Sequence, residues 1–176
     1  MRIVISAGHG LHVRGASGFL DEVDEARKVV EAVTSWLHEA GVEAVPYQDD
    51  ISTTQQENLH RIVDFHNSQV RDLDVSVHFN AFETTDMPMG TECLYVSQDT
   101  LAWDVSAAIA RAGKFVDRGA KLRTDLFFLN STEMPAILIE VCFVDSMADS
   151  DNYRAHFGLI TAAIAQALAG DAVPVA

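Results

Sequence analysis

Hydrophobic residues recur along this chain with two different periods. Short apolar segments typical of strands occur at residues 2–6, 42–47, 74–78, 90–96, 126–129 and 136–139. Between them, apolar residues recur every three or four positions, as in amphipathic helices, over residues 21–40, 52–70, 101–116 and 153–168. Strands that alternate with helices favour a layered α/β fold. We therefore expect an α/β protein with a twisted, mostly parallel but mixed sheet of about five to six strands, flanked by helices.

The length of the chain is sufficient for one sizeable core. It has 176 residues, of which 48% are hydrophobic, and it contains no repeat, low-complexity tract or internal linker. Two domains of ordinary size would not fit comfortably in this length. We expect one domain over residues 1–170, followed by a short C-terminal tail at 171–176.

Charge excludes several classes of partner. The formal net charge is -14. Proteins that bind nucleic acid or anionic membranes usually have clusters of lysine and arginine on the binding surface. No apolar run approaches the roughly 20 residues that a membrane span needs. The first residues do not resemble a secretory signal peptide. We expect no nucleic acid partner and no membrane insertion, with synthesis in the cytoplasm unless a leader has been removed.

Three of the expected strands end at a residue that can bind a metal or carry a proton. Residues 2–6 run into Gly8-His9-Gly10, residues 74–77 run into His78, and residues 136–139 run into Glu140. The carboxyl ends of strands in an open α/β sheet are where ligands bind. The pattern predicts one shared site for these three side chains.

Two histidines alone do not define a metal site, since the chain has five others: His12, His38, His60, His66 and His156. A third ligand would strengthen the hypothesis. Glu22 stands at the start of the first expected helix, from where its carboxylate could point back over the sheet edge. Acidic residues are common in a first helical turn, because they complement the helix dipole, and Asp21, Asp24 and Glu25 occupy the same turn. Spacing does not choose among these four acids.

Glu140 is unusual because it interrupts a buried strand. It follows Ile137-Leu138-Ile139 and precedes Val141-Cys142-Phe143. An unpaired buried carboxylate is costly, so Glu140 needs a metal, a proton or a cation close by, and an arginine partner is the structural alternative. Cys142 lies two positions further on and is expected to face the same side of the strand. We give this thiol no catalytic role, and Cys93 with Cys142 makes no disulfide framework.

A His, Glu, His ligand set is typical of catalytic zinc. Three protein ligands leave one position for water, whose pKa zinc lowers to about 7. A second carboxylate that does not bind the metal can accept the proton of that water and pass it to a leaving amine. The set therefore indicates hydrolysis of an amide.

Four segments, in the order in which they occur along the chain, resemble the zinc-dependent N-acetylmuramoyl-L-alanine amidases of the amidase-3 family. They are Ala7-Gly8-His9-Gly10, Glu22 ahead of an apolar helix, Ser76-Val77-His78-Phe79-Asn80-Ala81, and Pro135-Ala136-Ile137-Leu138-Ile139-Glu140-Val141-Cys142-Phe143. The resemblance extends from Arg2 to about Leu168, so that residues 1–170 would be an amidase catalytic domain. It departs from the family pattern at Ser6-Ala7 before Gly-His-Gly and at Leu11 after it.

The resemblance implies one catalytic Zn²⁺ held by His9, Glu22 and His78, with Glu140 as the catalytic acid and base. It selects Glu22 over Glu25, because Gly41 then follows the helix at the family's spacing. The substrate would be the amide between the lactyl group of N-acetylmuramic acid and L-alanine in peptidoglycan. Asn80 is a candidate for contact with the peptide, or a turn residue that bonds its own backbone.

A phage lytic enzyme is the biological role that we expect, with action at the cell wall or periplasm after release. An autolysin or sporulation amidase, secreted if a leader was removed, would have the same sequence features. A zinc peptidase or deacetylase of cell-wall material is an alternative activity, and a non-catalytic wall-binding module of the same fold is an alternative class. No helical insertion covers the site between Phe82 and Gly113, so we expect an open site.

Overall fold

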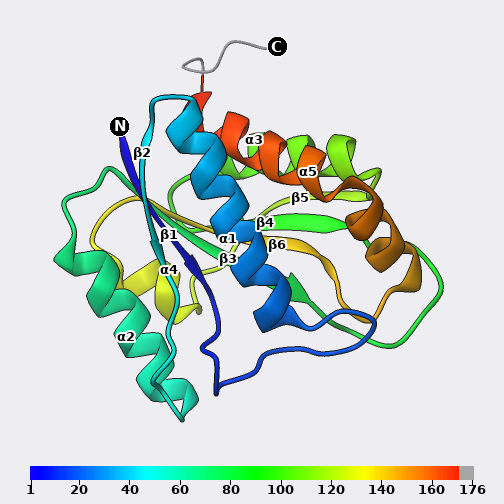
Figure 1. Ribbon diagram of the computed structural model, residues 1–176, viewed down its shortest axis with the longest axis horizontal. Coiled ribbons are helices and arrows are strands. Elements are labelled where there is room, and N and C mark those ends of the chain that lie inside the picture. The colour runs from blue at the N-terminus through cyan, green and yellow to red at the C-terminus, as the bar shows by residue number, and fades with distance from the viewer. Residues whose placement is uncertain (171–176) are drawn as a thin grey trace.

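The apolar strands assemble into one six-stranded sheet in the computed structural model, which describes residues 1–170 (Figure 1). The order across the sheet is β2-β1-β3-β6-β4-β5. The strands are β1 (Arg2–Ala7), β2 (Glu43–Tyr47), β3 (Leu73–Asn80), β4 (Thr91–Tyr95), β5 (Asp117–Leu122) and β6 (Ala136–Phe143). The first four strands in this order are parallel, whereas β4 pairs antiparallel with β6, and β5 runs parallel to β4. The expected mostly parallel, mixed sheet is confirmed.

Helices cover both faces of this sheet. They are α1 (Glu22–Glu39), α2 (Gln55–Ser68), α3 (Asp99–Gly113), α4 (Phe127–Ser131) and α5 (Met147–Ala169). The sequence explains where three of them begin, because Asp21, Thr54 and Ser146 are side-chain N-caps of α1, α2 and α5. Among residues 1–170, no helix combines the length and hydrophobicity that crossing a bilayer requires.

Strand alternation divides the core into two parts. Ile137 and Ile139 of β6 pack in the main core with α1, α3 and α5, whereas Leu138 packs with α2 and α4 in a smaller core. We call the second side the α2/α4 face. By the same alternation, Asp74, Ser76 and His78 of β3 lie on the α2/α4 face. The smaller core stops at Leu138, so that the ends of β3 and β6 beyond it are not covered by α2 and α4.

Two expectations about secondary structure were wrong. Residues 126–129 are not a strand, since α4 occupies Phe127–Ser131 and buries Phe128 and Leu129 against α2. The third helix ends at Gly113 rather than at residue 116, because Lys114 adopts a left-handed conformation (φ 55°) that terminates it. The chain then forms β5, which no sequence pattern indicated. The expected tail at 171–176 lies outside the described residues.

A buried polar network ties β1, β3 and α2 together. His66 of α2 has Nδ1 2.8 Å from Oδ1 of Asp74 and Nε2 3.0 Å from Oγ of Ser6. Arg71 donates to both oxygens of Asp74, at 2.9 and 3.0 Å. Ser6, His66 and Asp74 are fully buried. Although the order Ser, His, Asp is that of a hydrolase triad, no solvent reaches this serine, so we assign the network to stability.

Replacing Asp74 with alanine is expected to destabilise the fold by about 3–5 kcal/mol, because it leaves the Arg71 cation buried without its partner. The change is measured as the free energy of unfolding in urea. Asp64→Ala on the exposed side of α2 is the matched control and should change that free energy by less than about 0.5 kcal/mol. Equal effects of the two substitutions would contradict the assignment.

Candidate metal centre

The loop after β1 brings His9 to the carboxyl edge of the sheet beside His78 of β3. Their rings lie edge to face, with centroids 5.1 Å apart. Gly8 makes this approach possible: a Cβ at this position would lie 1.8 Å from Nε2 of His78. The N–H of Gly8 also donates to the carbonyl of Val77 at 2.9 Å. The glycine before His9 therefore sets the position of the second histidine.

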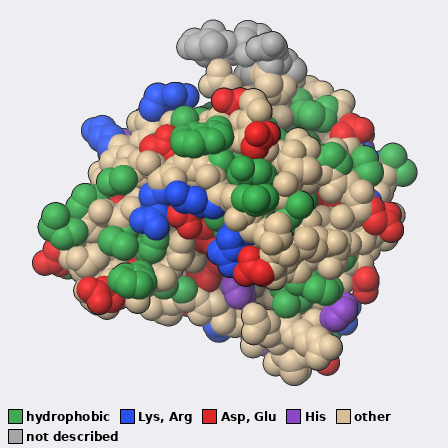
Figure 2. All heavy atoms as spheres, turned by 180° about the vertical axis from the view of Figure 1, so that it is seen from behind, with side chains coloured by type: hydrophobic (Ala, Val, Ile, Leu, Met, Phe, Trp, Pro, Cys, Tyr) green, Lys and Arg blue, Asp and Glu red, His purple; other side chains and the backbone are tan. Residues whose placement is uncertain are grey.

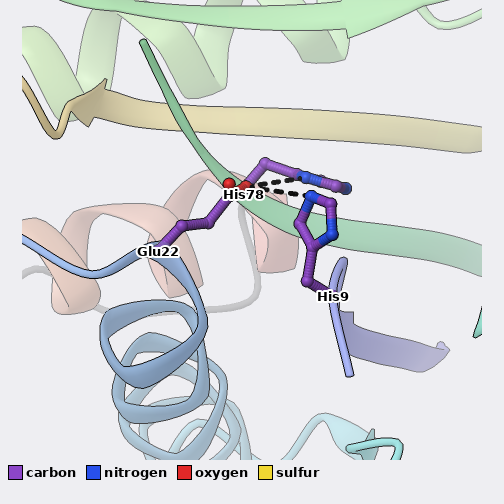
Figure 3. Close-up of side chains that lie close together, drawn as sticks. All are labelled: His9, Glu22 and His78. Carbon is purple, nitrogen blue, oxygen red and sulfur yellow. Dashed lines mark hydrogen bonds and ion pairs between the residues drawn. The ribbon is translucent and has the colours of Figure 1, made fainter. Parts of the chain in front are cut away.

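Glu22 completes the cluster from the first turn of α1. Its buried carboxylate has Oε1 3.0 Å from Nδ1 of His78 and 3.5 Å from Nε2 of His9 (Figure 3). Backbone N–H groups hold it in place, with Phe79 donating to Oε1 at 3.1 Å and Ala16 donating to Oε2 at 2.7 Å. Glu22 is thus oriented by two backbone donors towards both imidazoles.

The other three acids of this turn point elsewhere. Asp21 is the N-cap of α1 and, together with Asp24, pairs with Arg14. Glu25 accepts hydrogen bonds from Lys28 and from the hydroxyl of Tyr153. The structure therefore brings only Glu22 of the four to the histidines. In the part of the chain that the structure describes, one group of three or more histidine, cysteine, aspartate or glutamate residues could hold a metal ion, and it consists of His9, Glu22 and His78.

The donor geometry fits zinc. Tetrahedral ligands at zinc–nitrogen and zinc–oxygen bond lengths are about 3.3 Å from one another. The observed separations of 3.0 and 3.5 Å bracket this value, and all three donor atoms lie within 4.8 Å. Two imidazoles and one carboxylate are also a donor set that catalytic zinc uses. The residues present therefore fit the metal that the sequence indicates.

The electrostatics of the cluster favour an anionic Glu22 between two imidazoles. Burial raises the pKa of Glu22, but the hydrogen bond from His78 and the charges of both histidines outweigh it and hold this pKa below its ordinary value. Burial lowers the pKa of His9, and the neighbouring His78 lowers it further. For His78, burial is outweighed by the hydrogen bond to Glu22 and the charge of Glu140, so its pKa is raised. A cation in this position is stabilised by the same carboxylates.

Glu140 stands beside the cluster on the next strand. It is the register partner of His78 on one side and of Glu92 on the other. Its Oε2 is buried, with no hydrogen-bond partner among the described residues. Burial, aided by the charges of Glu22 and Glu92, raises the pKa of Glu140 to about 7 although His78 and Arg123 oppose the shift. A carboxyl group with this pKa can take up and release a proton at neutral pH.

A bulge in β6 corrects the expectation for Cys142. His78 pairs with Glu140, but Asn80 pairs with Phe143, so that β6 has one residue more than β3 in this interval. The alternation of side chains is broken there. Cys142 is buried in the main core, where burial raises the pKa of its thiol, and it does not share the face of Glu140.

Asn80 makes the turn-type hydrogen bond that was one of the two roles left open by the sequence. Its Oδ1 accepts from the N–H of Ala81 at 2.9 Å, as in a turn, and its Nδ2 donates to Oε1 of Glu92 at 3.2 Å. Contact with a substrate remains a prediction for this residue. Glu92 and its partner Arg118 were missed by the sequence reasoning, although Glu92 is an acid within an expected strand, the same signal that singled out Glu140.

Replacing Gly8 with alanine is expected to weaken zinc binding at least about tenfold, because the new methyl group would displace the imidazole of His78. Zinc affinity is measured by competition with a chromogenic chelator. Gly158→Ala is the matched control, since a Cβ there meets nothing within 4 Å, and it should leave the affinity unchanged. An unaltered affinity in Gly8→Ala would contradict the close packing of β1 against His78.

The sequence of this chain is similar to one protein family and to several known proteins. A family model described as N-acetylmuramoyl-L-alanine amidase matches residues 3–170. An uncharacterised 38.4 kDa protein of Clostridium perfringens is 35% identical over 162 residues, which are 88% of this chain and 46% of that protein. The uncharacterised protein YqiI of Bacillus subtilis is 31% identical over 157 residues, which are 85% of this chain and 73% of that protein. The chain spans about half the length of the C. perfringens relatives that it matches.

Solved structures share the same architecture. The catalytic domain of the CD27L endolysin targeting Clostridia difficile superposes with a TM-score of 0.80 at 27% identity, over 93% of this chain and 96% of that domain. The N-acetylmuramoyl-L-alanine amidase AmiC2 of Nostoc punctiforme has a TM-score of 0.81 at 25% identity, over 96% of this chain and 94% of that protein. The sheet and helices described above are therefore the fold of amidase catalytic domains.

Proposed function

The chain belongs to the N-acetylmuramoyl-L-alanine amidase family, and on this premise we propose that it hydrolyses the amide between the lactyl group of N-acetylmuramic acid and L-alanine in peptidoglycan. The observation that carries the proposal is the convergence of His9, Glu22 and His78 beside a carboxyl group, Glu140, whose pKa is close to neutrality. Residues 1–170 would form the amidase catalytic domain.

His9, Glu22 and His78 would hold one Zn²⁺. Zinc supplies a Lewis acid, which polarises an amide carbonyl and makes water a nucleophile at neutral pH. The protein contributes the fixed orientation of the ligands: the N–H groups of Ala16 and Phe79 hold Glu22, and the space left by Gly8 admits His78. Such support keeps ligands in place without a change of shape on binding.

Glu140 would move the proton. As a base it accepts a proton from the attacking water, and as an acid it gives that proton to the alanine nitrogen as the carbon–nitrogen bond breaks. Among residues 1–170 the buried Oε2 of Glu140 has no hydrogen-bond partner, so no group of the protein competes for the proton that it would take up or release. One carboxyl group with a pKa of about 7 can perform both transfers in one turnover.

Digestion of purified peptidoglycan tests this function. We expect new N-terminal alanine without new reducing sugar ends, and loss of this activity with a chelator and its return with added zinc. Release of acetate would indicate a deacetylase instead. Cleavage within the stem peptide would indicate a peptidase. Either product in place of N-terminal alanine would overturn the proposal.

For the biological role we propose a phage lytic enzyme that is made in the cytoplasm and acts at the cell wall after release. The similarity to an endolysin catalytic domain along 93% of the chain supports this role. The similarity to a bacterial amidase is of the same size, so an autolysin is the alternative. A gene located among phage structural and holin genes would support the lytic role, and a gene among cell-division or sporulation genes would contradict it.

A further inference from the structure

A row of charged side chains crosses four adjacent strands on the α2/α4 face. His78 of β3 pairs with Glu140 of β6, and Glu140 pairs with Glu92 of β4. Arg118, at the start of β5, donates from Nε to Oε2 of Glu92 at 2.7 Å. Neighbouring strands are about 4.8 Å apart, so the backbone of Arg118 is roughly 10 Å from that of Glu140. Figure 2 views the molecule from behind and shows acidic and basic side chains gathered beside a histidine near the middle of that view.

The contacts of Arg118 hold its guanidinium in one orientation. Glu92, which is buried, fixes Nε, and the guanidinium carbon lies 5.0 Å from the centre of the Phe143 ring. Nη1 makes one long contact, 3.4 Å, with the carbonyl of Met89. Among the described residues, Nη2 has no hydrogen-bond partner. A fixed guanidinium with a free edge is well suited to a carboxylate, which it binds with two parallel hydrogen bonds.

Arg123, the other arginine near Glu140, is a poorer candidate. Its Nε and Nη2 both donate to the carboxylate of Asp125 at 2.8 Å, so that its hydrogen-bonding edge is already occupied. An anionic ligand would have to displace this exposed pair. Arg118, whose one acidic partner takes only Nε, can bind a carboxylate without losing a contact.

The position of Glu140 tells which part of a substrate would pass over Arg118. A general acid must lie on the side of the leaving amine, and Glu140 lies on the β6 side of the three ligand residues. The released peptide would therefore extend from Glu140 over β4 towards β5, and the sugar would lie on the side of β1. An extended peptide advances about 3.3–3.6 Å per residue, so its second residue comes within reach of the Arg118 side chain.

We infer that Arg118 binds a carboxylate on the second residue of the released peptide and thereby favours acidic over amidated stem peptides. The inference rests on the proposed function, because it needs a peptide that leaves on the side of Glu140. It adds a specificity-determining residue to the site, separate from the groups that would perform the reaction.

The test compares two soluble substrates, N-acetylmuramoyl-L-alanyl-D-glutamate and its diamide, in which both carboxyl groups are neutral. For the wild type we expect a higher kcat/KM with the diacid. In Arg118→Gln the ratio of kcat/KM for diacid to diamide should fall by about 10- to 100-fold, the usual effect of losing a charge-assisted hydrogen bond. Arg111→Gln on α3, an exposed arginine on the other side of the sheet, is the matched control and should keep the wild-type ratio.

A double variant separates binding from structural damage. Arg118→Gln leaves Glu92 as an unpaired buried carboxylate, whereas Arg118→Gln with Glu92→Gln leaves a neutral pair. We expect the double variant to be folded by circular dichroism and to show the same reduced ratio. An equal loss for diacid and diamide, or a wild type that cleaves both equally well, would overturn the role of Arg118 and leave the proposed function standing. Cleavage of neither compound by the wild type would overturn both.

Discussion

Glu140→Gln is expected to reduce kcat on peptidoglycan by about 10²–10⁴-fold while zinc remains bound at one ion per chain. Glutamine has nearly the shape of glutamate, so the packing of β6 between β3 and β4 should be retained. It cannot, however, accept a proton from water or donate one to the leaving nitrogen. Activity is measured as released N-terminal alanine, and zinc is measured by mass spectrometry of the purified protein.

The pH dependence provides a second measurement on the same variant. Glu140 must be deprotonated to act first as the base, so kcat/KM should rise as pH increases through its pKa. This pKa is about 7 in the protein without metal, and a neighbouring cation would lower it. We therefore expect an acidic limb at or below pH 7 in the wild type that is absent in Glu140→Gln.

A matched substitution shows whether position matters. Glu83→Gln removes one carboxylate from the exposed loop after β3, and it should leave both kcat and the acidic limb unchanged. Wild-type activity in Glu140→Gln would show that another group moves the proton. Loss of zinc together with activity would show instead that Glu140 acts on the metal site.

His78→Ala is expected to abolish stoichiometric zinc binding. The activity should therefore fall at least about 10³-fold. The substitution removes one of three donor atoms and also leaves the buried carboxylate of Glu22 without its closest side-chain partner. The zinc content after dialysis against a weak chelator measures the first effect. The thermal midpoint gives an independent measurement, because an ion that binds only the folded state stabilises it.

The control for this substitution is another histidine of the α2/α4 face. His60 lies on α2, where its ring contacts Phe127 edge to face, away from the ligand cluster. His60→Ala should retain one zinc ion per chain. Its thermal midpoint should fall on addition of chelator by the same amount as that of the wild type. A full complement of zinc in His78→Ala would remove His78 from the set of ligands.

Hydrophobic periodicity was sufficient to predict most of the fold, because most elements bury one face. It failed where neighbours rather than the local sequence decide the structure. β5 has the sequence Asp117-Arg118-Gly119-Ala120-Lys121-Leu122, which is largely polar because it is an edge strand, and it is defined by its pairing with β4. The apolar run at 126–129 is too short for its period to distinguish strand from helix.

The site was predictable as far as strand ends could indicate it. His9, His78 and Glu140 were singled out because each follows a buried strand, and the structure brings their strands together. The choice of Glu22 among four acids depends on the N-cap at Asp21 and on two backbone donors, Ala16 in the loop before α1 and Phe79 in the distant strand β3. The bulge after Glu140 depends on the pairing of two strands. Neither the orientation of Glu22 towards the histidines nor the bulge in β6 can be predicted from the local sequence.

The reversal of β4 and β5 suggests that this domain is modular. In an all-parallel sheet, Glu92 and Arg118, near the starts of β4 and β5, would lie at the edge opposite to Glu140. Because β4 and β5 run antiparallel to β6, the starts of both strands lie at the same edge of the sheet as Glu140. The parallel strands β3 and β6, the loop after β1 and the first turn of α1 thus carry the residues proposed for the chemistry, whereas one continuous segment, residues 90–122, carries Glu92 and Arg118. Transplanting that segment from a relative should transfer its preference among peptides while the recipient keeps its own metal site.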